Sequence, residues 1–245
     1  MLDLILFSER LAHARRVEMD NFWGVERRRF LLRTFLSFPY TIATPQRLEP
    51  RTLAALKGRY HRGEIALTYP HRMASISLVA PAVRGRPKYH RERRRLIRRA
   101  EERCEITEPD FTTFYALYSE TAKARGRRPI PEAAMRRIYR MRGVDVIGVS
   151  VDGRTVGAIM NLALKDRYLL WQMGWNRDFA YLPTYLLHLS ITAGLERGYD
   201  LIDLGISPPT ASLKLKREMG GDTDRRIYVI RWDRLGRSFV KWPHP

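Results

Sequence analysis

Gln172 and Asp203 are polar residues in segments that are otherwise apolar, and both can take part in chemistry. The amide of Gln172 can orient an amine or a water molecule, unless it simply faces outward from a half-exposed strand. Asp203 is flanked by Ile202 and Leu204, where a carboxylate is costly unless it is paired. We therefore expect Asp203 either to bond the loop that follows it or to accept a proton.

A strongly basic segment runs from Arg84 to Arg99, with nine basic residues and one acidic residue, Glu92. The whole chain of 245 residues carries a formal net charge of +19. Positive charge of this size favours nucleic acid, anionic lipid or polyphosphate as a ligand, although a general preference for arginine would also produce it. Tyr89 and His90 stand among these charges, where they can stack on an unpaired base.

The composition, with 44% hydrophobic and 11% aromatic residues, indicates a globular protein. No apolar run approaches the roughly 18 residues of a membrane span, and residues 1–10 lack the pattern of a signal peptide. The single cysteine, Cys104, excludes an intrachain disulfide and a Cys-rich metal site. We expect a cytoplasmic protein with neither a bound metal nor a bound cofactor.

The C-terminal half must supply the elements that position these residues. Apolar residues at helical spacing predict helices, and β-branched segments separated by tight turns predict an antiparallel meander. The expected elements are a short strand at 105–106, helices at 107–126 and 131–143, antiparallel strands at 144–151, 155–164 and 168–175, a helix at 183–197, a short parallel strand at 201–205, a helix at 211–219 and a strand at 227–232.

Residues 1–87 have a weaker pattern. Candidate strands lie at 2–7, 64–69 and 75–83, the segment 11–38 is expected to be largely helical, and 52–57 begins a further helix. We expect four parts: a short first lobe over 1–87, a basic helix over 88–104, a second lobe over 105–235 and a tail over 236–245.

The order of elements in the C-terminal half resembles the GNAT acyltransferase superfamily. The resemblance implies an α+β fold with a mixed central sheet flanked by helices. Two neighbouring strands of that sheet splay apart after the meander, and the acyl donor lies in the cleft between them. The short first part would then be an abbreviated GNAT-like lobe, since Fem proteins resemble two such lobes in tandem.

Local motifs are similar to the Fem-like branch of that superfamily and to the related acetyltransferases. The similar stretches are 95–101, 114–118 with Thr121 and 125–126, 182–187 with 196–199 and 203–205, and 215–221. The last, Leu215-Lys216-Arg217-Glu218-Met219-Gly220-Gly221, resembles the signature Phe-Lys-x-x-Phe-Gly-Gly. Leu215 and Met219 replace its aromatic residues and keep its apolar character.

The resemblance implies roles for several residues in an amine's attack on an activated carbonyl. Lys216 would hold the donor and stabilise the negative charge that develops, unless it is a solvated lysine like its neighbours. Arg125 and Arg128 would hold an anionic acceptor, because a guanidinium pairs well with carboxylate or phosphate. The further expected site residues are Gln172 and Asp203 for catalysis and Gly174, Trp175 and Tyr185 for substrate binding.

The absence of one phosphate-binding motif favours aminoacyl-tRNA over acetyl-CoA as the acyl donor. Acetyl-CoA-dependent relatives hold pyrophosphate with a Gln/Arg-x-x-Gly-x-Gly/Ala loop, but residues 174–183 lack the glycine pair, and Pro183 has no N–H. Fem-like aminoacyltransferases share this absence, because their donor is aminoacyl-tRNA. The residues expected to contact tRNA are Arg84, Arg86, Lys88, Arg91, Arg94, Arg95, Arg98 and Arg99, with Arg93 in the same run.

Three functions therefore fit the sequence. The first is transfer of an aminoacyl group from tRNA to an amine on a peptide, a natural product or a cell-wall precursor. The second is a CoA-dependent N-acyltransferase, since an atypical loop can still bind CoA. The third is an RNA-binding protein without catalytic activity, which the charge alone would support.

Overall fold

The computed structural model describes residues 15–19, 22–29, 32–37, 47–74, 76–207 and 211–234. Two compact units divide them: Ala80–Asp224 form one, and the described residues before Ala80 and from Arg225 onward form the other. This division differs from the boundaries expected from the sequence. The basic helix belongs to the same unit as the C-terminal meander, and the last strand joins the N-terminal residues.

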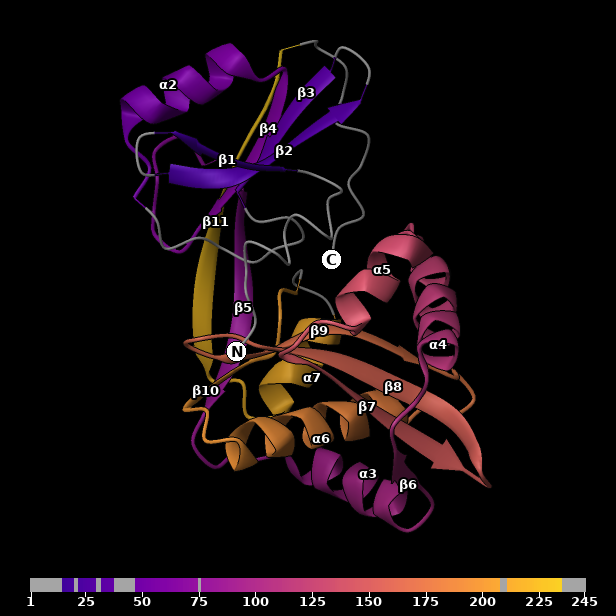
Figure 1. The fold of residues 1–245 in the computed structure, drawn as a ribbon. Coiled ribbons are helices and arrows are strands. Elements are labelled where there is room, and N and C mark those ends of the chain that lie inside the picture. The colour runs from indigo at the N-terminus through magenta and orange to yellow at the C-terminus, as the bar shows by residue number, and fades with distance from the viewer. Residues whose placement is uncertain are drawn as a thin grey trace. The chain divides into compact units, whose positions relative to one another are not determined.

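The C-terminal unit contains a mixed sheet flanked by helices, as predicted (Figure 1). Its strands lie in the order β5-β10-β9-β8-β7-β6, and every pair is antiparallel except β9 with β10. The elements are β5 (Ile76–Arg84), α3 (Arg91–Glu101), β6 (Glu105–Thr107), α4 (Phe111–Ala124), α5 (Glu132–Tyr139), β7 (Val144–Val151), β8 (Arg154–Ala163), β9 (Tyr168–Trp175), α6 (Leu182–Glu196), β10 (Leu201–Asp203) and α7 (Ala211–Glu218).

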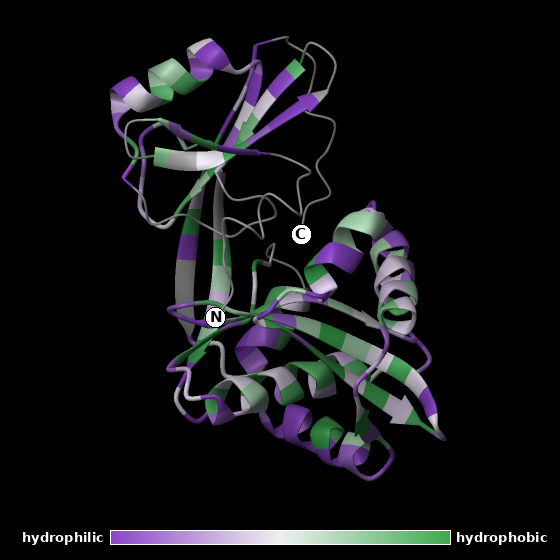
Figure 2. Ribbon diagram, viewed as in Figure 1, coloured by the Kyte–Doolittle hydropathy of each residue, from purple (hydrophilic) through white to green (hydrophobic). Residues whose placement is uncertain are grey.

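Helices cover both faces of this sheet. A Cβ placed on Gly174 in β9 would lie 2.2 Å from the backbone carbon of Leu117, so α4 covers that face. A Cβ on Gly157 in β8 would point the other way, 3.3 Å from Leu186 of α6. Since α5 packs with α4 and α3 packs on α6, the two pairs of helices lie on opposite faces of the sheet. Apolar residues gather where α6 meets the strands (Figure 2).

The sheet parts between β9 and β10, as expected. The two strands pair in parallel only at Tyr168 with Ile202 and at Leu169 with Asp203. β10 ends there, while β9 continues to Trp175. In the described part of the chain, the stretch of β9 from Leu170 to Trp175 therefore has no β10 partner along that edge.

Helix α4 begins later than predicted. Thr107 belongs to the short strand β6, and Asp110 is the N-cap, whose Oδ1 accepts a hydrogen bond from Thr113 N at 2.7 Å. Pro109 explains the shift, because the residue before a proline disfavours helical backbone. The second helix, α5, ends at Tyr139 rather than near Gly143.

The N-terminal unit corrects the main error of the sequence interpretation. The segment 11–38, expected to be helical, contains three strands within its described residues: β1 (Arg15–Met19), β2 (Phe22–Arg29) and β3 (Leu32–Leu36). With β4 (Arg62–Leu67) and β11 (Thr223–Asp233) they form the order β1-β2-β3-β4-β11. Helix α2 (Pro50–Arg59) confirms the helix expected at 52–57. The strand expected at 2–7 and the tail at 236–245 lie outside the described residues.

Cross-strand packing explains why strands replace the expected helix. Phe22 and Phe35 are fully buried and pack with Leu56, Tyr60 and Ile65, which lie far from them in sequence. The arginines of β2 favour helix locally, but such preferences amount to a few tenths of a kcal/mol per residue. Burial of two phenylalanines contributes far more.

Glu26 is a buried carboxylate in the N-terminal unit, with 2% of its surface exposed. Its Oε2 accepts hydrogen bonds from Arg33 Nη2 at 2.9 Å and Tyr60 OH at 3.0 Å, and Arg28 Nε donates to Oε1. Burial opposes its ionisation, but the hydrogen bonds from Arg33, Arg28 and Tyr60 outweigh burial and lower the pKa of Glu26 from 4.5 to about 2. The ionised carboxylate thus joins β2, β3 and the end of α2.

Replacing Glu26 with glutamine should lower the free energy of unfolding at pH 7 by on the order of 2 kcal/mol, because it leaves arginines facing a neutral group. The pKa of Glu26 is lower in the folded chain, so its contribution is present above about pH 4.5 and is lost as the pH falls towards 2. Urea unfolding at pH 7 and pH 3 measures both effects.

Glu18→Gln is the matched control for Glu26→Gln. Glu18 pairs with Arg16 on the surface, where both side chains are about half exposed, at 55% and 44%. Its loss should cost less than about 0.5 kcal/mol. Equal losses in the two variants, or a Glu26 effect that is unchanged at pH 3, would contradict the buried ion cluster.

Candidate active site

Lys216 lies at the point where β9 and β10 part. Its side chain extends from α7 and is 8% exposed. The ammonium donates hydrogen bonds to Gly205 O at 2.8 Å and to Ile206 O at 3.3 Å. Both carbonyls belong to the loop that follows β10, so Lys216 is held beside the split in the sheet and does not face bulk solvent.

The surroundings of Lys216 lower the pKa of its ammonium group. Desolvation lowers the pKa of Lys216 from 10.5 to about 8, Asp203 opposes this shift, and Arg125 and Arg127 add to it. At neutral pH the side chain is therefore mostly an ammonium ion, yet it releases a proton far more readily than a surface lysine. Such a group can stabilise negative charge and can also give up a proton.

The loop after β10 needs Gly205. Gly205 has φ = +74°, and a Cβ there would lie 2.7 Å from Leu170 O of β9. A residue with a side chain would be strained in this backbone region and would press on the neighbouring strand. Gly205 therefore lets the loop that binds Lys216 come close to the unpaired edge of β9.

Asp203 stabilises the same loop. It is 5% exposed, its Oδ1 accepts a hydrogen bond from Gly205 N at 2.9 Å, and its Oδ2 lies 3.4 Å from Arg167 Nε. Of the two expected roles, these contacts match the bond to the following loop. A direct part for Asp203 in proton transfer stays a prediction.

A cluster of arginines lies close to Lys216. The guanidinium of Arg125 sits 4.7 Å from the centre of the Trp175 ring, a cation–π contact that fixes both expected site residues. Desolvation and the positive charges of Arg127 and Arg177 lower the pKa of Arg125. Arg125 and Arg128, the two arginines expected here, are both exposed, and the contacts described place only Arg125 in this cluster.

Arg127 and Arg177 were missed from the sequence. Arg127 is positioned by the end of α4, where Gly126 has φ = +68° and Arg127 N donates to Ala122 O at 2.9 Å. This arrangement turns the chain back on the helix, as glycine-containing helix ends commonly do. The sequence Arg125-Gly126-Arg127 could have indicated this position. The turn at Gly126 brings Arg127 back towards the helix and close to Lys216.

Gln172 and Gly174 share the face of β9 that α4 covers. Trp171 is an extra residue in β9, between the pairs Leu170–Asn161 and Gln172–Met160, and forms a bulge beside the split. Gln172 is half-buried. The space over Gly174 is occupied by the backbone of Leu117 and Tyr118, so this residue allows α4 to approach and is not open to a substrate.

Tyr185 lies apart from this cluster. It is 4% exposed in the core, stacks on His188 with ring centroids 6.2 Å apart, and its pKa is raised by burial and then by the charge of Glu101 in α3. The structure thus places Tyr185 between α6 and α3. The substrate-binding role expected for it has no support in these contacts.

The basic helix α3 presents its charges to solvent. The residues expected to contact tRNA are all exposed, namely Arg84, Arg86, Lys88, Arg91, Arg94, Arg95, Arg98 and Arg99. Ile97 and Ala100 are buried on the opposite side of the helix. The exposed face is therefore available to an anionic ligand.

Arg93 differs from its neighbours. Its Nε and Nη2 donate to Glu218 Oε2 at 2.8 and 2.7 Å, and its Nη1 donates to Thr184 Oγ1 at 3.2 Å. His90 N also donates to Glu218 O at 2.9 Å. Arg93 therefore fastens α3 to α6 and α7 instead of facing a ligand.

The start of α6 has no polar cap. The N-cap is Tyr181, its side chain makes no capping hydrogen bond, and Pro183 lies in the first turn. In the described residues, no group of three or more His, Cys, Asp or Glu side chains is placed to hold a metal ion. None of the helices described has the length and apolar content that crossing a bilayer requires.

Comparison with known proteins identifies one family. The model of the acetyltransferase (GNAT) domain matches residues 84–216, which is more than half of the chain. The match begins in the basic segment and ends at Lys216. No curated protein sequence matches the chain.

Solved structures share the fold at low sequence identity. L-PGS from Bacillus licheniformis has a TM-score of 0.60 at 11% identity, covering 97% of this chain and 89% of that one. The C-terminal domain of a putative lysylphosphatidylglycerol synthetase from Agrobacterium fabrum has a TM-score of 0.60 at 11% identity, covering 94% and 87%. FemX has a TM-score of 0.56 at 11% identity, covering 89% and 85%.

Proposed function

Because this chain belongs to the acetyltransferase (GNAT) domain family and is an acyltransferase of that type, we propose that it transfers an aminoacyl group from aminoacyl-tRNA to an amine. The observation that carries the proposal is the buried ammonium of Lys216 beside the split between β9 and β10. An ester carbonyl placed in this split would develop its negative charge next to a fixed cation.

The reaction follows from these groups. The acceptor amine attacks the ester carbonyl, a C–N bond forms, and the C–O bond to the tRNA ribose breaks. The amine loses a proton to water, and the departing ribose oxygen needs one. Lys216, with a pKa of about 8, supplies that proton and regains it from solvent. Asp203 keeps Lys216 in place by holding the loop that binds it.

The acceptor carries an anionic group in this proposal. Arg125 and Arg127 lie near Lys216, and both suit a carboxylate or phosphate. Arg177 adds a third positive charge beside Arg125. An acceptor held by this cluster would have its amine directed towards the split, which is the orientation that accelerates a two-substrate reaction.

Three features favour aminoacyl-tRNA over acetyl-CoA as donor. The start of α6 lacks a glycine-rich phosphate loop, the exposed face of α3 is strongly basic, and the sequence motifs resemble the Fem-like branch. FemX and lysylphosphatidylglycerol synthetase are also among the structures that share the fold. The matching family is described as acetyltransferases. A CoA thioester is therefore the competing donor.

A donor assay tests the proposal. The protein is incubated with a pool of tRNAs charged with labelled amino acids and with mixed amine acceptors. We expect loss of the aminoacyl ester beyond spontaneous hydrolysis, and tRNA binding that weakens steeply with salt. Acetyl-CoA should leave the melting temperature unchanged.

Two results would contradict the proposal. Stabilisation by acetyl-CoA, together with no tRNA binding at low salt, would identify a CoA-dependent enzyme. Binding of tRNA without transfer to any acceptor, unchanged by replacement of Lys216, would identify an RNA-binding protein without catalytic activity.

A further inference from the structure

Arg167 is a buried arginine in the turn between β8 and β9, and no role was expected for it. Its backbone oxygen accepts a hydrogen bond from Leu164 N at 3.0 Å, which closes the turn. Its Nη1 donates to Asp166 Oδ2 at 3.0 Å, and its Nε lies 3.4 Å from Asp203 Oδ2. A buried guanidinium is costly unless carboxylates face it, so the contact with Asp203 is what keeps this charge inside the protein.

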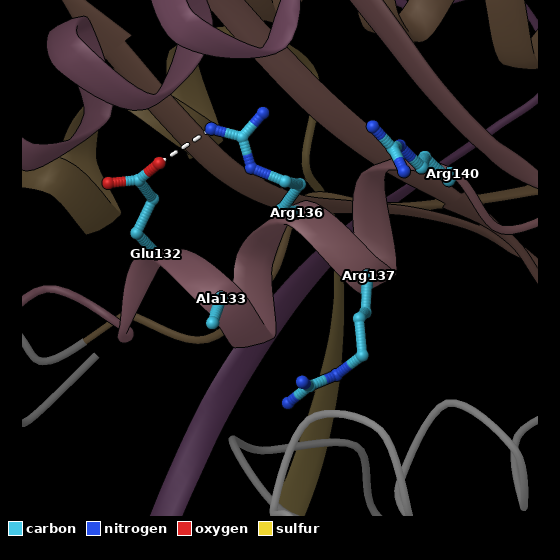
Figure 3. A pocket seen from close by; sticks show the side chains of 5 residues that line it. All are labelled: Glu132, Ala133, Arg136, Arg137 and Arg140. Atoms are coloured by element: carbon cyan, nitrogen blue, oxygen red, sulfur yellow. Dashed lines mark hydrogen bonds and ion pairs between the residues drawn. The ribbon is translucent and has the colours of Figure 1, made fainter.

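The pair of Arg167 and Asp203 differs from the surface ion pairs of the same unit. Both of its side chains are 7% exposed. Arg136 and Glu132 on α5, which Figure 3 shows joined by a dashed line, are 41% and 54% exposed. Surface pairs of that kind contribute little, because water screens both charges. The charges of Arg167 and Asp203 are poorly screened, so they act strongly on other charges nearby.

A chain of contacts leads from Arg167 to Lys216. Leu169 of β9 pairs with Asp203 of β10, which brings the start of β9 next to the carboxylate. The Oδ1 atom of Asp203 accepts a hydrogen bond from Gly205 N at 2.9 Å. Gly205 O in turn accepts one from Lys216 Nζ at 2.8 Å. The carboxylate thus faces Arg167 with one oxygen and, with the other, holds the loop that binds Lys216.

The charged groups that act on Lys216 come from β10 and from the chain after α4. Desolvation lowers the pKa of Lys216, Asp203 of β10 raises it, and Arg125 and Arg127 lower it further. The carboxylate is therefore the counter-charge through which a more distant residue can act on the ammonium. The other charged residues of α7 itself are Lys214, Arg217 and Glu218.

We propose that Arg167 is a positioning residue for Lys216 and acts through Asp203. Arg167 holds the carboxylate where it can bind the loop at 204–206, and it balances part of the negative charge that Lys216 also faces. The ammonium is thereby kept beside the split between β9 and β10. Arg167 itself touches no substrate in this arrangement. The inference rests on the proposed function, because Lys216 is the group that is positioned.

The first test follows the titration of Lys216 by NMR, with no substrate present. The full chain carries isotopically labelled lysine, and the signal that is missing in Lys216→Met identifies Lys216. In Arg167→Gln the midpoint should rise above about 8, because the charge of Asp203 is no longer shared with a guanidinium. In Asp203→Asn the midpoint should fall, because the counter-charge is lost while the amide oxygen can still accept from Gly205 N.

The opposite directions separate the proposal from a merely structural role. Both variants break the same ion pair, so a loop that simply loosened would admit water to Lys216 in both and raise both midpoints. Shifts in the same direction, or no shift in either variant, would overturn the inference. Arg167→Lys keeps the charge and should leave the midpoint nearer the wild-type value than Arg167→Gln does. It serves as the test if Arg167→Gln does not fold.

Arg197→Gln is the matched control for Arg167→Gln. Arg197 also pairs with an aspartate, Asp145, at 3.0 Å, but its side chain is 52% exposed. The variant removes the same charge from the same unit and should leave the midpoint of Lys216 unchanged. Equal shifts in the two variants would show that net charge alone explains the effect, and the inference would be wrong.

Rates of transfer give a second readout. Arg167→Gln should lower kcat by about 10- to 100-fold with little change in KM, since a small misplacement of a reacting group costs up to about 100-fold. In the Lys216→Met background the same change should have less than about a twofold effect, because Arg167 acts through the ammonium. An undiminished effect there would contradict the inference. The NMR titration needs no donor, so a failed transfer assay leaves its result intact, and the two proposals fail independently.

Discussion

Replacing Lys216 with methionine should lower the rate of acyl transfer about 100- to 1,000-fold, the usual cost of removing one group that stabilises an oxyanion. Methionine keeps an unbranched side chain of similar length but has no charge and no proton to give. Initial rates with the donor that the donor assay identifies measure the effect, and a thermal melt shows whether the fold is retained.

Lys214→Met is the matched control for Lys216→Met. Lys214 lies on the same helix, but its side chain is 77% exposed and pairs loosely with Glu218 at 3.9 Å. Its replacement should leave the rate within about twofold, since surface ion pairs contribute little. Comparable losses in the two variants would show that Lys216 has no special part in transfer.

The pH profile gives a second test of Lys216. With a pKa of about 8, Lys216 loses its charge as the pH rises through that value, so the rate should fall on the alkaline side. Lys216→Arg, which keeps its charge, should move this fall to higher pH. A wild-type profile without such a fall would contradict the role of the ammonium.

Deprotonation of Lys216 does not itself favour unfolding above pH 8. The pKa of Lys216 is lower in the folded chain than its ordinary value of 10.5, so between these values the unfolded chain binds more protons. Stability therefore rises with pH in this window as far as Lys216 is concerned. A thermal melt at each pH shows whether the fold is retained over the range in which the rate falls.

Gly174→Ala should destabilise the C-terminal unit by about 3 kcal/mol or more, the upper range for overpacking. The added methyl would lie 2.2 Å from the backbone carbon of Leu117 and 2.3 Å from the nitrogen of Tyr118. Backbone cannot turn aside as a side chain can, so α4 would have to move off the sheet. Urea unfolding measures the loss.

Gly157→Ala gives a matched control in the neighbouring strand. Its added methyl would meet the ends of two leucine side chains, Leu186 at 3.3 Å and Leu182 at 3.4 Å. These ends can shift, so the cost should stay below about 1 kcal/mol. If Gly174→Ala is no worse than Gly157→Ala, the close approach of α4 to β9 is wrong.

The C-terminal unit could be predicted from sequence because its signals are local. The meander strands are short, β-branched and separated by tight turns, and α6 has Pro183 at its start and Gly198 just past its end. The parallel pairing of β10 followed from the helix before it. The bulge at Trp171 could not be predicted, because it depends on the register with β8.

The N-terminal residues were predicted only in part. Helix α2 and strands β4 and β5 match the elements expected at 52–57, 64–69 and 75–83, but β1, β2 and β3 depend on distant partners. The pairing of β3 with β4 joins residues such as Phe35 and Gly63, and β4 in turn pairs with β11, more than 150 residues further along the chain. Glu26 lies in a strand, where its charge suggests a surface, yet it is buried by three elements. A single segment carries no sign of such contacts.

The roles of the expected site residues stay predictions. Lys216 was selected from a motif, but Arg127 was not selected and Arg93 was grouped with the arginines that face a ligand, because runs of arginine look alike in sequence. A turn at Gly126 and an ion pair with Glu218 give these two residues different roles. The direction of a long charged side chain is decided by partners that the local sequence does not reveal.

The carboxylate of Glu218 links the basic helix α3 to α7, the helix that carries Lys216. Glu218 binds Arg93 of α3 through its side chain and His90 through its backbone, and it lies two residues after Lys216 on α7. These contacts join α3, with its outward-facing arginines, to the helix that carries Lys216. In the proposed reaction, a donor bound on α3 must also reach Lys216, so the length of its reactive arm becomes a criterion of selection alongside its charge.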